Sequence, residues 1–171
     1  MTEKLRKEIR EVFYRFGGGL IAIDNAVTQI HAIYKTTGGE MKALSIRQPW
    51  AWLIVHGYKD IENRTWPLPR HFSLPQRIYV HTGRSWDANA MDFIRPLVKP
   101  AISALICYPQ NLPRGAIIGE VDILDCVSRS KSQWFFGPYG FLLANPVAYE
   151  KPIPMKGHLG FFEVEQSLTV R

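Results

Sequence analysis

The sequence predicts an α+β domain built on a small, closed or half-closed β-barrel with flanking helices, preceded by a helical hairpin. Two observations predict it. Residues 1–40 place apolar side chains at helical spacing. From Met41 onward, short β-branched runs bounded by glycine and proline alternate with few helical patterns, in the order β-α-β-β-α-β-β-β. A boundary near residues 36–39 therefore separates a hairpin extension, 1–40, from a domain, 41–171.

The expected hairpin consists of two amphipathic helices with a glycine break between them. Apolar residues from Leu5 to Phe16 repeat at helical spacing until the triple glycine at 17–19. Asp24 or Asn25 is then suited to cap the second helix. If its apolar face is exposed, this hairpin is a candidate element for dimerisation or for docking a protein partner.

The domain that follows is expected to begin with a strand and a short helix. Pro49 suits a first helical position, Trp50, Leu53 and Ile54 form an i, i+3, i+4 apolar face, and Gly57 suits the helix end. Residues 87–106 are expected to be partly helical, interrupted by prolines. Strands are expected at 42–46, 60–66, 78–81, 115–127, 139–149 and 158–164.

Composition restricts the class of protein. Apolar residues make up 46% of 171 and charged residues 21%, which is typical of a globular chain. No apolar run approaches the ~20 residues that cross a bilayer, so we expect a cytoplasmic protein without membrane contact. The two cysteines lack metal-ligand spacing, and so do His56, His71, His81 and His158 among the five histidines, so neither a metal nor another cofactor is expected.

The positive charge lies mainly in the second part. Residues 1–40 hold 6 basic and 5 acidic side chains, a net +1, whereas residues 41–171 hold 15 and 10, a net +5. An excess of this size permits an anionic partner such as nucleic acid without requiring one.

Lys59, Glu62 and Arg64 are the candidate catalytic residues. On an extended segment Glu62 and Arg64 point to one face, where they can pair. One interpretation is a solvated ion pair worth about 0–1 kcal/mol. The other places the three at the mouth of the barrel, with Lys59 as a base or fixed cation and Arg64 clamping a carbonyl or phosphate oxygen.

Eight further residues are candidates for contact with a ligand or nucleic acid. Ser45, Arg47, Gln48 and Trp50 surround a strand-to-helix junction, whose free N–H groups suit an anion; the alternative is simple capping with Trp50 in the core. Trp66 and Trp134 are candidates for base stacking. Lys156 is a candidate phosphate contact or a solvated lysine, and His81 a ligand contact or a structural histidine.

Five segments in this order resemble one known family. They are Gln48-Pro49-Trp50-Ala51, Gly57-x-Lys59-x-x-Glu62-x-Arg64-x-Trp66, Gly119-x-Val121-Asp122-Ile123-x-Asp125-Cys126-x-Ser128, Asn145-Pro146 and Pro152-Ile153-Pro154-x-Lys156-Gly157. Together they are similar to the ASCH (activating signal cointegrator homology) domain, a PUA-like β-barrel, over about residues 42–164. The likeness is closer to the cointegrator-type branch than to the compact bacterial branch, and residues 1–40 have no counterpart in it.

The resemblance implies a cleft that carries Lys59, Glu62 and Arg64 and binds RNA. It also implies possible hydrolase activity, because compact members hydrolyse the acetyl amide of acetylated cytidine and at least one member cleaves RNA. The amidohydrolase signature reads Gly-x-Lys-x-x-Thr-x-Arg, so Lys59 and Arg64 match it. Glu62 stands where the catalytic threonine would be, which removes the hydroxyl nucleophile and leaves Glu62 as a hypothetical general base.

Three functions follow as hypotheses, in this order. The first is a module that binds RNA or a modified nucleoside through a basic cleft. The second is a hydrolase of the acetylcytidine amidohydrolase or ribonuclease type that uses Lys59, Glu62 and Arg64. The third is a protein-interaction or coactivator-type module that uses residues 1–40.

Overall fold

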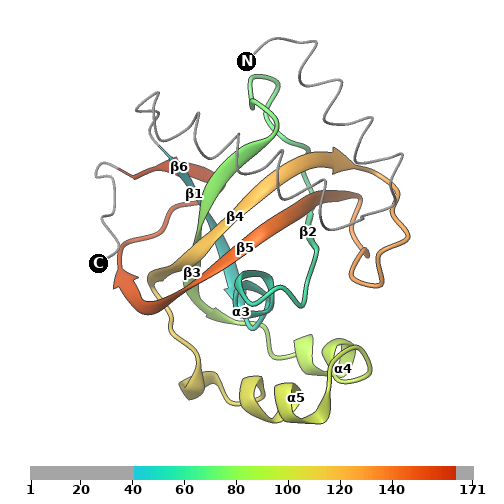
Figure 1. The fold of residues 1–171 in the computed structure, drawn as a ribbon, viewed down its shortest axis with the longest axis vertical. Coiled ribbons are helices and arrows are strands. Elements are labelled where there is room, and N and C mark those ends of the chain that lie inside the picture. Colours follow the sequence, from blue (N-terminus) through green and yellow to red (C-terminus); the bar gives the residue numbers. More distant parts are fainter. Residues whose placement is uncertain (1–40, 165–171) are drawn as a thin grey trace. The chain divides into compact units, whose positions relative to one another are not determined.

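A computed structural model of the chain describes residues 41–164, so the expected hairpin over residues 1–40 lies outside the described residues. With the labels of Figure 1, the elements in chain order are β1 (Lys42–Gln48), α3 (Trp50–Val55), β2 (Ile61–Arg64), β3 (Gln76–Trp86), α4 (Ala90–Ile94), α5 (Pro100–Ile106), η1 (Pro109–Asn111), β4 (Ala116–Val127), β5 (Tyr139–Pro154) and β6 (Phe161–Glu163). This confirms the α+β class and the order of the strands.

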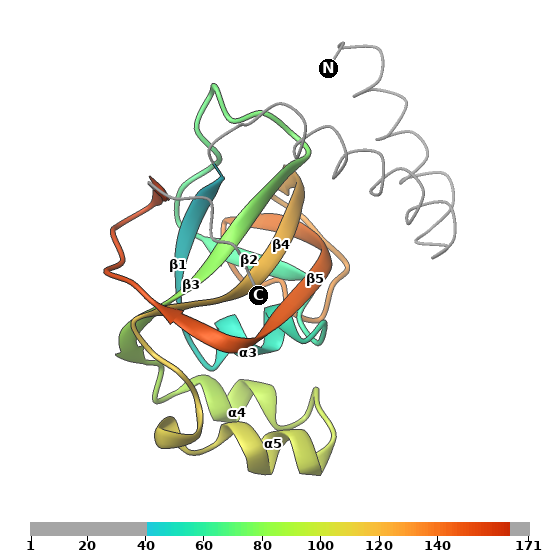
Figure 2. The same cartoon turned by 60° about the vertical axis from the view of Figure 1, so that its left-hand side comes forward.

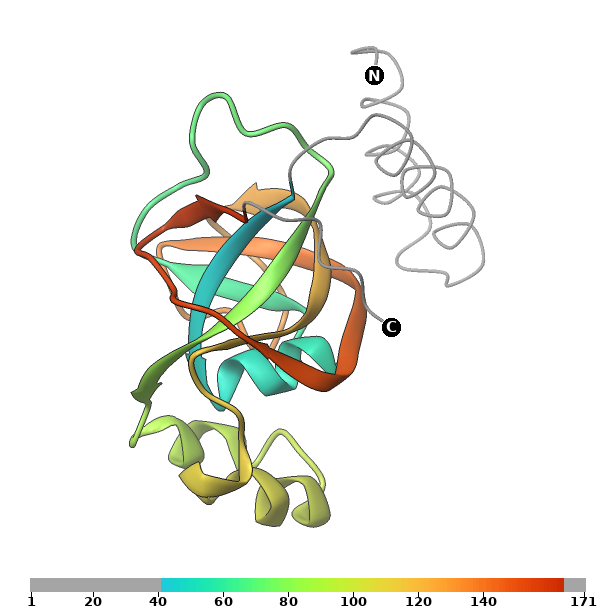
Figure 3. The same ribbon diagram turned by 90° about the vertical axis from the view of Figure 1, so that its left-hand side faces the viewer.

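The strands form one mixed sheet in the order β2-β5-β4-β3-β1-β6. β1 and β3 run parallel, and the other neighbours are antiparallel. Figures 2 and 3 show the sheet curling around itself, with α3 at one end of the curl. The ladder between the two long strands, β4 and β5, contains three register shifts, and such irregularities bend a strand locally.

The expectation of a closed barrel is corrected by this topology. Among residues 41–164, β2 and β6 are the edges of the sheet and do not pair with each other. Both are short, with four and three residues, and β6 pairs only with the first part of β1, Lys42–Leu44. The rest of that edge of β1 therefore carries backbone groups that no strand on this side satisfies, as expected at a sheet edge.

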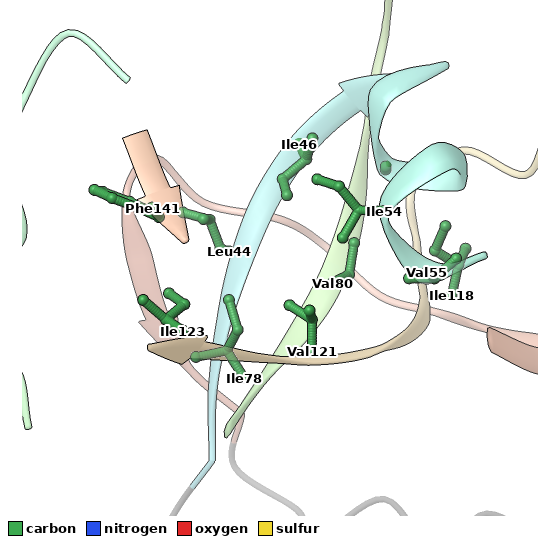
Figure 4. Packing of buried hydrophobic residues seen from close by; sticks show 11 residues of the cluster. Leu44, Ile46, Ile54, Val55, Ile78, Val80, Ile118, Val121, Ile123 and Phe141 are labelled. Carbon is green, nitrogen blue, oxygen red and sulfur yellow. The ribbon is translucent and has the colours of Figure 1, made fainter. Parts of the chain in front are cut away.

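The interior of the curl is filled by apolar side chains from five elements. Figure 4 shows side chains of β1, α3, β3, β4 and β5 converging, among them Leu44, Ile54, Ile78, Val121 and Phe141. These five side chains are at most 1% exposed. Burial of each contributes roughly 1.5–3 kcal/mol, and together they hold α3 against the sheet.

A second apolar cluster lies between α3, β2, α4 and α5. It contains Leu53, Ile61, Ile94, Ile106 and Trp134, all buried. α4 and α5 therefore pack beside the end of the curl where α3 lies (Figure 1). No helix within residues 41–164 is long and apolar enough to span a membrane.

Candidate functional site

Lys59 is buried at the point where α3 turns back into the sheet. Gly57 follows the helix with φ +76°, a left-handed conformation that favours glycine. The main-chain N–H groups of Tyr58 and Lys59 then both donate to the carbonyl of Leu53, at 2.9 and 3.1 Å. This tight turn directs the lysine side chain inward, where it is only 1% exposed.

The ammonium of Lys59 has two acceptors in its buried position. It donates to the main-chain carbonyl of Ile61 and to Oε2 of Glu62, the latter at 2.9 Å. Its Nζ also lies 5.7 Å from the centroid of the Trp50 ring, a cation–π contact. Burial lowers the pKa of Lys59 from its usual value, and the charge of Glu62 opposes that shift.

Glu62 and Arg64 lie on one face of β2, as their spacing predicted. Oε1 of Glu62 is 3.2 Å from the NH2 group of Arg64, so the carboxylate joins Lys59 to Arg64. The side chains of Glu62 and Arg64 are 10% and 18% exposed. The cluster is therefore a buried lysine–glutamate–arginine chain and not the solvated surface pair that was the alternative.

Arg64 also reaches a neighbouring part of the sheet. Its NH2 group donates to the main-chain carbonyl of Ser45 on β1 at 2.9 Å, and its guanidinium lies 5.6 Å from the Trp66 ring centroid. The Nε of Arg64 is buried without a hydrogen-bond partner.

Ser45 connects Arg64 to the buried His81. Ser45 Oγ lies 3.0 Å from His81 Nδ1, and His81 Nε2 lies 3.0 Å from the carbonyl oxygen of Met155. Because a carbonyl only accepts, Nε2 carries the proton and the hydroxyl of Ser45 donates to Nδ1. Burial lowers the pKa of His81, so the ring is neutral at pH 7.

Gly157 closes over this pair. A Cβ at that position would lie 2.2 Å from Cε1 of His81 and 2.8 Å from Oγ of Ser45, so the backbone of Gly157 approaches where no other residue fits. Residues from four separate segments thus meet along one seam: the turn after α3 with β2, the middle of β1, the middle of β3, and the loop before β6.

Comparisons with known proteins identify the family of the chain. The family model of the ASCH domain matches residues 44–155, well over half of the chain. The chain belongs to the ASCH domain family.

Activating signal cointegrator 1 of Homo sapiens is 28% identical over 141 residues, which cover 73% of this chain and 22% of that protein. The protein of the same name in Mus musculus is 27% identical over 141 residues, with the same coverage. The chain spans about a fifth of the length of these two relatives.

Solved ASCH structures are similar to this chain at low identity. The crystal structure of ASCH from Zymomonas mobilis has a TM-score of 0.48 and 17% identity, covering 74% of this chain and 89% of that one. A structure of a point mutant of the same protein has a TM-score of 0.41 and 20% identity, covering 68% and 76%.

The strand-to-helix junction of this ASCH domain is capped from within. Gln48 is fully buried; its Nε2 donates to the carbonyl of Pro113 at 2.9 Å and its Oε1 accepts from the main-chain N–H of Trp52 at 3.0 Å. Gln48 thus caps one of the N–H groups at the start of the helix, which favours the capping alternative for this junction. Trp50 is half-buried, and its Nε1 donates to Oδ2 of Asp87 at 2.9 Å.

The other predicted ligand residues differ in exposure. Arg47 and Lys156 are exposed, and Lys156 precedes Gly157 in the loop over His81. Trp66 is half-buried, with edge-to-face contacts to Phe141 and Phe161. Trp134 is only 7% exposed and belongs to the second apolar cluster, so little of its ring is open to a base.

Sequence reasoning missed two aromatic residues beside the site. Phe136 is 55% exposed and Phe93 37% exposed, and both contact Trp50, at centroid distances of 5.9 and 6.1 Å. The sequence Trp134-Phe135-Phe136 signalled an aromatic loop without showing which ring faces solvent. In the described part of the chain, no group of three or more His, Cys, Asp or Glu side chains is placed to hold a metal ion.

Proposed function

We propose that this ASCH domain binds RNA or a modified nucleoside, with Arg64 as the contact for a phosphate or carbonyl oxygen of the ligand. One observation carries the proposal: the guanidinium of Arg64 is held in place by Glu62 and Ser45, while 18% of the Arg64 side chain stays exposed. A guanidinium fixed in this way loses little conformational entropy when it binds an oxygen.

The charge of the cluster supports an anionic ligand. Lys59 and Arg64 bring two cationic groups to one carboxylate, Glu62. With Lys59 protonated, the cluster holds one uncompensated positive charge in a mostly desolvated position. Such a charge is costly unless it is paired, and a phosphate would pair it.

Salt-titrated binding to a short single-stranded RNA tests this proposal. We expect Arg64→Ala to lose roughly ten- to hundredfold in affinity, as for the loss of a charged hydrogen bond. The matched control is Arg84→Ala, which removes an exposed arginine of β3. Urea unfolding of each variant shows whether it is folded. The proposal is contradicted if the two folded variants bind RNA with equal affinity. It is also contradicted if the affinity of the wild type does not change with salt concentration.

A hydrolase is the second candidate, and the buried Lys59 favours it. Burial lowers the pKa of Lys59, which favours an amine that can accept a proton, and the two oxygens of Glu62 are already held by Lys59 and Arg64. In amide hydrolysis, neutral Lys59 would take a proton from water as the water attacks the carbonyl. Arg64 would stabilise the oxyanion, and the proton would pass to the leaving amine.

Deacetylation of acetylated cytidine separates this candidate from binding alone. We expect turnover by the wild type to fall by at least about a hundredfold in Lys59→Ala, as for the loss of a general base. Equal turnover by the two proteins removes Lys59 from the mechanism. Absence of turnover together with intact RNA binding leaves the binding module as the function. A protein-interaction role for residues 1–40 remains a prediction about residues outside the described part of the chain.

A further inference from the structure

An aromatic side chain stands exposed on the loop between β4 and β5. Phe136, in residues 128–138, is 55% exposed. Its ring meets that of Phe93 at a centroid distance of 4.8 Å and that of Trp50 at 5.9 Å. Phe93 is itself 37% exposed. We call Phe136, Phe93 and Trp50 the aromatic platform.

The loop that carries Phe136 is tied to β2 and the turn before it. Oδ1 of Asn63 accepts from the main-chain N–H groups of Phe136 and Gly137, at 3.0 and 3.2 Å. The amide of Asn63 donates to the carbonyl of Trp134 at 2.8 Å, and Ser132 Oγ donates to Oδ1 of Asp60 at 2.6 Å. Phe136 is therefore exposed and positioned at the same time, which lowers the entropy cost of binding.

The same loop carries positive charge and no negative charge. Its sequence, Ser-Arg-Ser-Lys-Ser-Gln-Trp-Phe-Phe-Gly-Pro, contains Arg129 and Lys131 and neither aspartate nor glutamate. Both cations are exposed. Exposed aromatic rings beside cations are the combination by which proteins hold single-stranded nucleic acid, with bases on the rings and phosphates on the cations.

The platform borders the Lys59–Glu62–Arg64 cluster through a shared ring. Trp50 contacts Phe136 and also lies 5.7 Å from Nζ of Lys59. Asn63, which anchors the loop of Phe136, lies between Glu62 and Arg64 on β2, so its side chain points to the opposite face of the strand. The platform and the cluster therefore share Trp50 as a common neighbour.

We propose that the aromatic platform stacks one unpaired base of single-stranded RNA, while Arg129 and Lys131 contact phosphates next to that base. The inference rests on the proposed RNA-binding function and specifies the form of the ligand. A base inside a duplex has both faces covered by its neighbours, so only an unstacked base can lie against Phe136. The platform thus selects single strands over duplexes.

Substitutions of Phe136 test the platform in the full chain. We expect Phe136→Ala and Phe136→Leu to weaken binding of a single-stranded RNA of about ten nucleotides by roughly five- to hundredfold, the range of base–aromatic stacking. Phe136→Tyr keeps a ring and should bind like the wild type. The matched control is Tyr108→Ala, since Tyr108 is 56% exposed but belongs to the connection after α5.

The salt dependence separates stacking from charge. Phe136→Ala should leave the slope of log K against log salt unchanged, whereas Arg129→Ala and Lys131→Ala should each reduce it by about 0.7, the value for one phosphate contact on a single strand. The wild type should bind a blunt duplex of the same length more weakly than the single strand.

Four results would overturn the inference. The first is that Phe136→Ala binds as tightly as Tyr108→Ala, and the second is that Phe136→Tyr loses all binding. The third is that the wild type binds a duplex as tightly as a single strand. The fourth is that the wild type forms a dimer and Phe136→Ala is a monomer. The last result would assign the platform to a second copy of the chain. If Arg64→Ala weakens RNA binding and Phe136→Ala does not, only this inference fails. If the wild type binds no RNA, the proposed function fails as well.

Discussion

Arg64 on β2 donates to the main-chain carbonyl of Ser45 on β1 at 2.9 Å, although these strands share no backbone ladder in the described sheet. The contact spans the gap that keeps the curled sheet from closing into a barrel. A side chain here satisfies a carbonyl on the part of β1 that β6 does not cover. The same guanidinium pairs with Glu62, so the residue proposed to contact a ligand also connects β2 to β1.

Replacement of Arg64 by lysine should therefore destabilise the domain although the charge is kept. A lysine offers a point charge and cannot reproduce the planar guanidinium that contacts Glu62, Ser45 and the Trp66 ring. We expect Arg64→Lys to lower the free energy of unfolding by about 1 kcal/mol and Arg64→Ala by about 2 kcal/mol. Urea unfolding measures both, and Arg84→Lys, at an exposed arginine, is the control. A midpoint for Arg64→Lys equal to that of the wild type would show that the seam contact contributes nothing.

Loss of the carboxylate of Glu62 should cost more than loss of an exposed ion pair. Lys59 is 1% exposed at its side chain and would keep only neutral acceptors, the carbonyl of Ile61 and an amide oxygen of the new glutamine. We expect Glu62→Gln to reduce the free energy of unfolding by roughly 3 kcal/mol, as when a buried pair loses one partner. Lys59→Met in the same chain should recover part of that loss, because the unpaired ammonium is then gone.

A double-mutant cycle over Lys59 and Glu62 measures this coupling directly. The two single variants and the double variant are unfolded in urea at pH 7. We expect a coupling energy of about 1–3 kcal/mol, as for residues that share one ion-pair network. Additive losses would mean that the two side chains do not act as a unit.

Local sequence patterns were enough to predict the parts of this site that depend on neighbouring residues. Alternation along β2 placed Glu62 and Arg64 on one face because side chains of a strand alternate with a period of two. The helix between Pro49 and Gly57 was predicted with its turn, since proline and glycine restrict those positions. The long strand at residues 115–127 was predicted from its β-branched residues and is confirmed as β4.

The parts that depend on distant residues could not be predicted from such patterns. Ser45 and His81 are 36 positions apart, and nothing local shows that the backbone of Gly157 covers both. Burial of Trp134 and exposure of Phe136 are decided by Asn63, which holds their loop from another strand. A closed or half-closed barrel was expected, but which strands pair at the edges depends on contacts between distant segments, and β2 and β6 remain unpaired with each other in the part of the chain that the structure describes.

A methyl group at position 157 should disturb the seam. In Gly157→Ala the new Cβ would meet Cε1 and Nδ1 of His81 at 2.2 and 2.6 Å, so the loop or the ring has to move. We expect a loss of about 1–3 kcal/mol in the free energy of unfolding, as for overpacking in a tight interior. Gly83→Ala is the matched control, because the nearest atom to its added Cβ is 4.0 Å away. The thermal unfolding midpoints of the two variants are compared. Equal midpoints would show that the loop of Gly157 can move to accommodate the methyl group without loss of stability.

His81 should make the stability of the domain fall as the pH drops below about 6.5. Burial lowers the pKa of His81 in the folded state, whereas the unfolded chain keeps a value near 6.5. Above that pH both states are neutral at this residue and stability is highest. Below it the unfolded state binds the proton first, so stability is lost as the pH falls toward the folded-state pKa, at no more than about 1.4 kcal/mol per pH unit for one proton.

Urea unfolding at pH 7.5 and pH 5.5 measures this loss. His81→Gln should show a smaller decrease between the two pH values than the wild type, because the glutamine does not titrate. His71→Gln, at an exposed histidine, should keep the decrease of the wild type. An NMR titration of the His81 ring should give a pKa below 6.5 because of burial. A steeper acid loss in His81→Gln than in the wild type, or a ring that titrates above 6.5, would mean that the protonated imidazole is the better partner for Ser45 and Met155.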